Sequence, residues 1–253
     1  MSTTHASRLP SDGFARWNSR VWRLAGPIIL ANISTPLLGA VDTAVMGHLP
    51  DPAYIGGVAI GAVIFDFLFW GFGFLQMSTS GFTAQAQGAG NRVEVRATLI
   101  RALALALGLG LLLILLQAPI VALAFLMMDT SPQVEGLARS YYAIRIWSAP
   151  FALANYVVLG WLLGRQRAGL ILVLQLALNG TNIALDLLFV VGFGWGIEGV
   201  ALATLIAQGG GLALALCFAR SALVAKEPAV SWSRLADRGR LAALFHVNTN
   251  IMI

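Results

Sequence analysis

Three carboxylates, Asp42, Asp66 and Asp186, fall inside long apolar runs, where an acidic side chain requires a chemical reason. A carboxylate at the centre of a bilayer costs a few kcal/mol, so such residues usually face a polar interior and bind something there. No Lys or Arg in these runs is an obvious partner, and a buried, unpaired carboxylate takes up a proton or binds a cation. The sequence therefore predicts a proton or sodium site at Asp42 and Asp186.

Polar residues at helical spacing precede two of these acids. Each set has steps of three or four residues, which places its members on one helix face: Gln175, Asn179, Asn182 and Asp186 in one run, and Asn32, Thr35, Gly39 and Asp42 in another. Both helices thus present polar groups and then a carboxylate. Simple hydrogen bonding between helices is the structural alternative, and it is most credible for single residues such as Asn179, Asn182 and Thr204.

Further candidates have weaker patterns. Thr204 and Gln208 are four residues apart and are followed by three glycines, Gly209–Gly211, where a helix or a cavity could approach. Asp66 lies among aromatic residues with no amide nearby, so it is a secondary candidate. Pro27 and Pro36 each remove a backbone hydrogen bond and predict a hinge beside Asp42, although proline is also frequent in membrane helices generally.

The elements that position these residues follow from hydropathy. The chain of 253 residues is 58% apolar and 11% charged, against about 45–50% and about 25% in soluble domains. Six apolar runs exceed the ~20 residues that a helix needs to cross a bilayer, namely 22–47, 54–86, 97–128, 133–164, 168–192 and 196–219. They lack the alternating polarity of barrel strands. The predicted fold class is an all-α integral membrane bundle of six transmembrane helices.

Basic residues divide unevenly between the two sides of this bundle. One side would hold Arg8, Arg16, Arg20, Arg23, Arg92, Arg96, Arg101, Arg165, Arg167, Arg220, Lys226, Arg234, Arg238 and Arg240. The other side would hold only Arg139 and Arg145. The positive-inside rule then places the N-terminus in the cytoplasm and makes the net charge of +5 a topology signal rather than a sign of nucleic-acid binding.

The two ends of the sequence differ from the spans. Residues 1–21 are expected to form a cytoplasmic tail and residues 221–240 a cytoplasmic linker. Residues 241–253 become apolar again and are too short to cross a bilayer. We expect them to begin a seventh helix, which makes the sequence a fragment; an interfacial helix is the alternative.

Several function classes are excluded by missing motifs. Cys217 is a single cysteine, and His5, His48 and His246 are too far apart for a metal motif. The sequence has no HExxH, no P-loop and no Ser with a partner His inside the spans. An enzyme, an ATP-driven pump and a bound cofactor are therefore not expected.

Four runs in order closely resemble the multidrug and toxic compound extrusion (MATE) family, in its DinF branch. These runs are LAGPIILANISTPLLGAVDTAVMGHL (24–49), GFTAQAQGAGN (81–91), APFALANYVVLGWLLGRQ (149–166) and LNGTNIALDLLFVVGFGWGIEGVALATLIAQ (178–208). The resemblance implies the N-lobe of a transporter of two six-helix lobes around a central cavity. It also implies that the C-terminal lobe is missing from this sequence.

The resemblance suggests roles at matching positions. Asp42 matches the first-helix aspartate used for cation coupling, and Asn182, Asp186 and Thr204 match the amide, acid and hydroxyl of the N-lobe cavity. Pro27 matches a proline at which the first helix is proposed to bend. The remaining cavity candidates are Asn179 one turn earlier, the looser matches Asn155 and Tyr141, and Gln175, Gln208 and Asp66 from the polar pattern alone.

These observations predict a secondary antiporter of the inner membrane. It would export organic compounds, cationic or amphipathic, in exchange for protons or sodium, with the bilayer and the absent lobe as its partners. The sequence leaves three alternatives: a lipid or lipid-linked-saccharide flippase of the same broad superfamily, a non-transporting assembly protein, and a chain that pairs with itself.

Overall fold

The computed structural model describes the backbone of residues 11–47, 49 and 51–223, with side chains for all of these except 11–17, 20, 24, 35–38 and 221–223. Within this part six helical stretches are long and apolar enough to cross a membrane: Val21–Met46, Ala53–Gly88, Arg92–Leu115, Pro132–Gly164, Ala168–Gly192 and Gly196–Arg220. The predicted six-helix membrane bundle is confirmed. Most of the expected linker and the expected seventh helix lie outside the described residues.

The helices of the described part are connected by short turns. Their bounds are α1 Ser11–Met46, α2 Ala53–Trp70, α3 Phe74–Gly88, α4 Arg92–Leu115, α5 Gln117–Met127, α6 Pro132–Arg145, α7 Ala149–Gly164, α8 Ala168–Asp186 and α9 Gly196–Leu223. A short 3₁₀ turn, Ile146–Ser148, joins α6 to α7, and a π-helical turn, Leu187–Gly192, continues α8.

Two spans differ from the runs read from hydropathy. The second is divided at Gly71–Gly73 into α2 and α3. The third ends at Leu115 instead of 128, and α5 follows as a separate short helix. Pro119 explains this boundary, because it has no N–H to donate to Leu115 but fits the first turn of a new helix.

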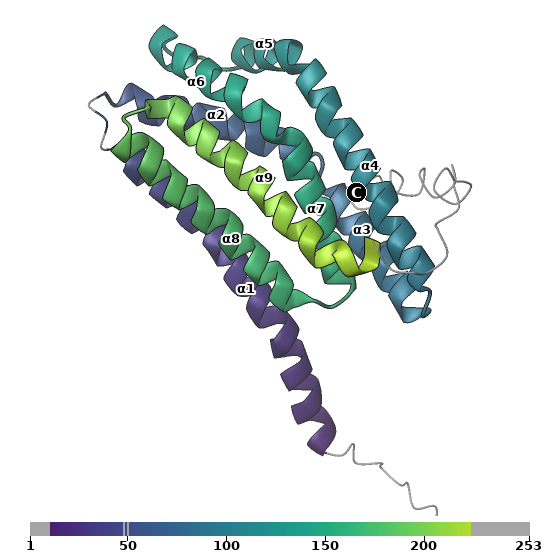
Figure 1. Ribbon diagram of the computed structural model, residues 1–253. Coiled ribbons are helices and arrows are strands. Elements are labelled where there is room, and N and C mark those ends of the chain that lie inside the picture. The colour runs from purple at the N-terminus through teal and green to yellow at the C-terminus, as the bar shows by residue number, and fades with distance from the viewer. Residues whose placement is uncertain (1–10, 48, 50, 224–253) are drawn as a thin grey trace, which may run out of the picture.

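The helices pack in a sequence that brings distant parts of the chain together (Figure 1). Helix α1 lies along α8, which packs on α9; α9 contacts α6 and α7; α7 packs between α3 and α4; and α2 lies on α6. The first and fifth spans, which carry the two polar stripes, are therefore neighbours.

Glycines set the closest of these approaches. A Cβ on Gly57 of α2 would lie 2.7 Å from Leu137 Cβ of α6, and a Cβ on Gly61 would collide with the ring of Tyr141. On α7, a Cβ on Gly164 would lie 2.6 Å from the carbonyl oxygen of Ser80. Small residues let membrane helices approach closely, so the Gly57–Gly61 pair acts inside this lobe, where it joins α2 to α6.

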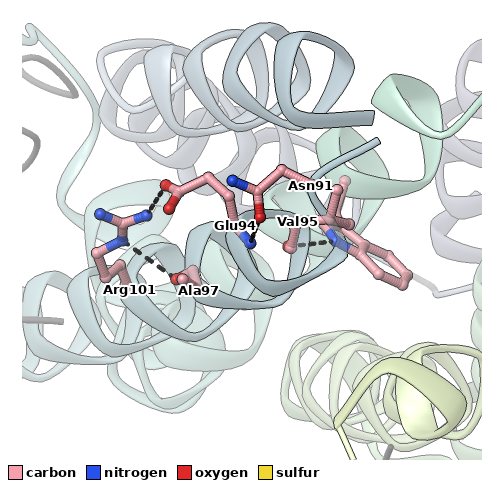
Figure 2. A network of polar contacts seen from close by, with 6 residues as sticks. Asn91, Glu94, Val95, Ala97 and Arg101 are labelled. Atoms are coloured by element: carbon pink, nitrogen blue, oxygen red, sulfur yellow. Dashed lines mark hydrogen bonds and ion pairs between the residues drawn. The ribbon is translucent and has the colours of Figure 1, made fainter. Parts of the chain in front are cut away.

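The beginning of α4 is fixed by a network of polar contacts (Figure 2). Asn91 caps the helix, since its Oδ1 accepts from the Glu94 N–H at 3.0 Å. Arg101 donates to Glu94 in a largely buried ion pair. The indole N–H of Trp161 on α7 donates to the Val95 carbonyl at 3.1 Å. These contacts fix the position of α4 against α7.

Candidate functional site

The centre of the site is a pair of carboxyl groups from α1 and α8. Asp42 is half-buried near the end of α1, and Asp186 is fully buried at the end of α8. The two side chains lie within hydrogen-bonding range of each other. Neither Asp186 oxygen receives a hydrogen bond from a donor within the described residues, and neither does Asp42 Oδ1. Two carboxyl groups this close can hold a proton or another cation between them, which offsets the repulsion of their charges.

An amide and a hydroxyl lie next to the pair. Asn182, one turn before Asp186, donates from Nδ2 to Thr204 Oγ1 of α9 at 3.3 Å, and Thr204 in turn donates to the Val200 carbonyl at 3.1 Å. This leaves Asn182 Oδ1 buried without a donor. Carboxyl and amide oxygens are ligands for a hard cation, so the group suits sodium as well as a proton. No cluster of three or more His, Cys, Asp or Glu side chains occurs in the part of the chain described.

The rest of the α8 stripe connects α8 to α1. Asn179 donates from Nδ2 to Ser34 Oγ of α1 at 2.7 Å, and Gln175 donates to Asn179 Oδ1 at 3.4 Å. The Ser34 hydroxyl in turn donates a hydrogen bond to the Ala31 carbonyl at 2.6 Å. The structure thus places the stripe on one face, and Asn179 has both a structural contact and a cavity-facing side.

A cavity of about 490 Å³ opens beside this stripe. Its polar lining comprises Asn32, Asp66, Gln76, Arg145, Tyr156, Gln175, Asn179 and Gln208. The cavity candidates Asp66, Gln175, Asn179 and Gln208 are therefore brought together. Asp42, Asp186, Asn182 and Thr204 are not in its wall, and Arg145, which lines the cavity and acts electrostatically on both acids, connects the cavity with the carboxyl pair.

Asn155 and Tyr141 lie behind the cavity wall. The buried amide of Asn155 on α7 donates to the backbone carbonyl of Gln208 at 3.1 Å and to its Oε1 at 2.9 Å. Tyr141 is buried against α2 and accepts a hydrogen bond from Arg145. Both residues position groups that line the cavity.

Arg145 is the site residue that the sequence pattern missed. The distribution of basic residues along the sequence assigned Arg145 to a connection between spans, but it lies within the fourth span, Pro132–Gly164. Its guanidinium lies 4.7 Å from the ring centroid of Phe65 and 5.3 Å from that of Tyr141. It acts electrostatically on both Asp42 and Asp186. The expectation that these acids have no basic group nearby is wrong, because the cation comes from a different span.

The two predicted hinge residues lie in a continuous helix. Helix α1 runs from Ser11 to Met46 through Pro27 and Pro36. The side chain of Pro36, like that of Thr35, lies outside those described. A hinge at either proline stays a prediction.

The fold and the site define a membrane protein lobe with a polar cavity and a close pair of carboxyl groups, and comparison with known proteins identifies its family. Residues 27–188 match the family model described as MatE. The chain belongs to the MATE family, whose members are transporters and not enzymes.

Individual relatives support this assignment. The chain is 45% identical over 233 residues to the DNA damage-inducible protein F of Escherichia coli, covering 92% of this chain and 51% of that protein. It is 30% identical over 189 residues to a probable multidrug resistance protein NorM of Rhizobium meliloti, covering 72% of this chain and 39% of that protein. The chain thus spans about half the length of these relatives or less, and the resemblance to the DinF branch is confirmed.

Solved structures show the same fold. An outward-facing MATE family multidrug resistance transporter superposes with a TM-score of 0.79 at 22% identity, over 91% of this chain and 51% of that one. A MATE structure described as the bent conformation gives 0.78 at 24% identity, over 92% of this chain and 52% of that one. The described helices therefore have the arrangement of one half of such a transporter.

Proposed function

We propose that this chain is the N-lobe of a secondary antiporter that exports organic compounds, cationic or amphipathic, in exchange for protons or sodium. The observation that carries this proposal is the close approach of the Asp42 and Asp186 carboxyl groups, together with a cavity of about 490 Å³ whose lining residue Arg145 acts electrostatically on both acids. The half-length coverage of the relatives supports a second lobe facing this one in the native protein.

The mechanism follows from the charge of the pair. When a proton or sodium ion binds from the outer side, the pair loses negative charge, and the cavity holds a cationic compound less well. Release of the ion to the cytoplasm restores the negative charge and the affinity. Rocking of one lobe against the other would expose the cavity to each side in turn.

The proposal includes the location and orientation. Six spans make a multi-pass membrane protein, and the excess of basic residues on one side supports an N-terminus in the cytoplasm and a location in the bacterial inner membrane. Labelling of single cysteines, introduced at Asn91 and at Trp195 after replacing Cys217, should reach the first position from the cytoplasm and the second from outside.

Flux measurements in proteoliposomes test the function. The native protein that contains this chain is purified from membranes, and a proton or a sodium gradient is imposed separately. Substrate should collapse one of these gradients. Asp42→Asn should lower that coupled flux at least about tenfold, which corresponds to a free-energy difference of about 1.4 kcal/mol. Asp129→Asn, a change at an exposed loop carboxylate, is the matched control. Unchanged flux with Asp42→Asn would remove the coupling role.

A further inference from the structure

The cavity wall carries one positive and one negative side chain that are not paired with each other. Arg145 and Asp66 both line it. Among the described residues the acid–base pairs are Arg101 with Glu94 and Arg139 with Glu135, and neither Arg145 nor Asp66 takes part in one. Charges inside a membrane protein are expensive unless they are paired or functional, so two unpaired opposite charges in one cavity require an explanation.

The guanidinium of Arg145 is held in place by its neighbours. One Nη donates to the Tyr141 hydroxyl, and the planar group lies against the rings of Phe65 and Tyr141. Its Nε is buried without an acceptor among the described residues. A guanidinium offers several donors in a fixed planar arrangement that matches a carboxylate, and prior fixation lowers the entropy lost on binding. The remaining donors are thus preorganised for an anionic group.

Asp66 supplies the opposite charge from α2. Its side chain is exposed toward the cavity. Tyr156, also in the wall, is within electrostatic range of both Asp66 and Arg145. Aromatic side chains in the same wall, those of Phe69 and Trp70, add apolar surface to the cavity.

A purely internal role for Arg145 explains only part of this arrangement. Its charge does act on Asp42 and Asp186, and this compensates one negative charge of the pair. A compensating cation has no need to reach the cavity, and it does not account for Asp66. A ligand with two opposite charges accounts for both residues.

We propose that this cavity binds organic zwitterions, with the carboxylate of the ligand on Arg145 and its cationic group toward Asp66. The proposal rests on the proposed function and narrows its substrate class from cationic compounds to compounds that also carry an anionic group.

Two fluorescent probes that differ in one charge provide the test. Rhodamine B carries a delocalised cation and a carboxylate, and its ethyl ester keeps the cation on the same ring system without the carboxylate. Binding of each probe to the native protein, purified in detergent, is measured by fluorescence anisotropy. The variants are Arg145→Gln, Arg145→Lys and Asp66→Asn. The control is Arg139→Gln, which removes an exposed arginine from the same helix.

The expected pattern is selective. Arg145→Gln should weaken rhodamine B binding about tenfold to a hundredfold, the usual value of a hydrogen bond to a charged group, and should leave the ester within about twofold. Arg145→Lys should retain part of the rhodamine B affinity. Asp66→Asn should weaken both probes, and Arg139→Gln neither. Unchanged ester binding also shows that the Arg145 variants are folded.

Two results would overturn the zwitterion site: equal losses for the two probes with Arg145→Gln, or no binding of rhodamine B by the parent protein. Equal losses would assign Arg145 to the charge balance of Asp42 and Asp186 alone. The gradient assay separates this outcome from the proposed function. If the protein exchanges the ester for an ion but shows no preference for rhodamine B, the antiporter function holds and the zwitterion site is wrong. If rhodamine B binding depends on Arg145 but no coupled flux is measured, the zwitterion site holds and the antiporter function is wrong.

Discussion

The carboxyl group of Asp42 on α1 faces that of Asp186 at the end of α8 within hydrogen-bonding range, although the two residues are separated by most of the described chain. Two carboxylates this close do not both stay ionised in a desolvated place, because each charge disfavours the other. We therefore predict that the pair acts as one site with one shared proton, or with a cation in its place.

Asp186→Asn tests the shared proton through stability. The amide can donate to Asp42 as a protonated acid does, and it removes a fully buried acidic group. We expect the melting temperature of the purified protein to stay equal or to rise, while ion-coupled flux falls at least about tenfold. Asp186→Ala, which leaves a cavity and no donor, should lower stability by about 1–3 kcal/mol. If both variants lose the same stability, the side chains do not share a proton.

Gly110→Ala tests the contact between α4 and α7. A Cβ at this position would lie 2.6 Å from the backbone nitrogen of Pro150, which cannot move without shifting α7. Such overpacking costs about 1–3 kcal/mol. Gly108→Ala is the matched control, because it lies two residues away on the same helix with no atom within 4 Å of its added Cβ. Thermal unfolding in detergent should separate the two variants, and equal stability would disprove the close contact.

Glu94→Gln tests the buried ion pair at the beginning of α4. The side chains of Arg101 and Glu94 are 5% and 15% exposed. Removing one partner of a buried pair typically costs about 3–5 kcal/mol. Glu135→Gln removes the partner of Arg139 in a pair that is 44% and 35% exposed, and exposed pairs contribute about 0–1 kcal/mol. If the Glu94→Gln and Glu135→Gln proteins melt at the same temperature, the Arg101–Glu94 pair contributes no more to stability than an exposed pair.

The fold class and the polar stripe of α8 could be predicted because their signals are local. Apolar runs and turn residues specify six spans, and steps of three and four specify the α8 stripe up to Asp186. The packing of α1 against α8 could not be predicted in this way, since the spacing of polar residues indicates which face of a helix is polar and not which helix packs against that face.

Arg145 could not be assigned correctly from the sequence. Positive charges are counted by their distance from span ends, and the charge count grouped Arg145 with Arg139, which lies six residues earlier in the chain. Its place depends on α6 packing on α2, where Gly57 and Gly61 admit Leu137 and Tyr141. That contact joins helices far apart in the sequence. A glycine pair in the sequence alone is equally consistent with contact between two copies of the chain.

Asn155 links stability to ligand binding, and two variants separate these effects. Its amide donates to the backbone carbonyl of Gln208 at 3.1 Å and to its side-chain oxygen at 2.9 Å, with only 2% of the residue exposed. Asn155→Asp keeps the size of the side chain but places a carboxylate oxygen, an acceptor, against the two acceptor oxygens of Gln208. We expect a loss of about 1–3 kcal/mol of stability, the usual cost of unpaired buried polar groups.

The same contact aims Gln208 at the cavity. Asn155→Leu should therefore weaken probe binding in the parent protein and have a smaller effect when Gln208→Ala is already present, because the side chain being positioned is then gone. The backbone carbonyl remains in both backgrounds, so the stability loss should persist in both. Anisotropy titrations and thermal unfolding of the four proteins provide the measurement. Independent, additive effects on binding would show that Asn155 supports α9 without positioning Gln208.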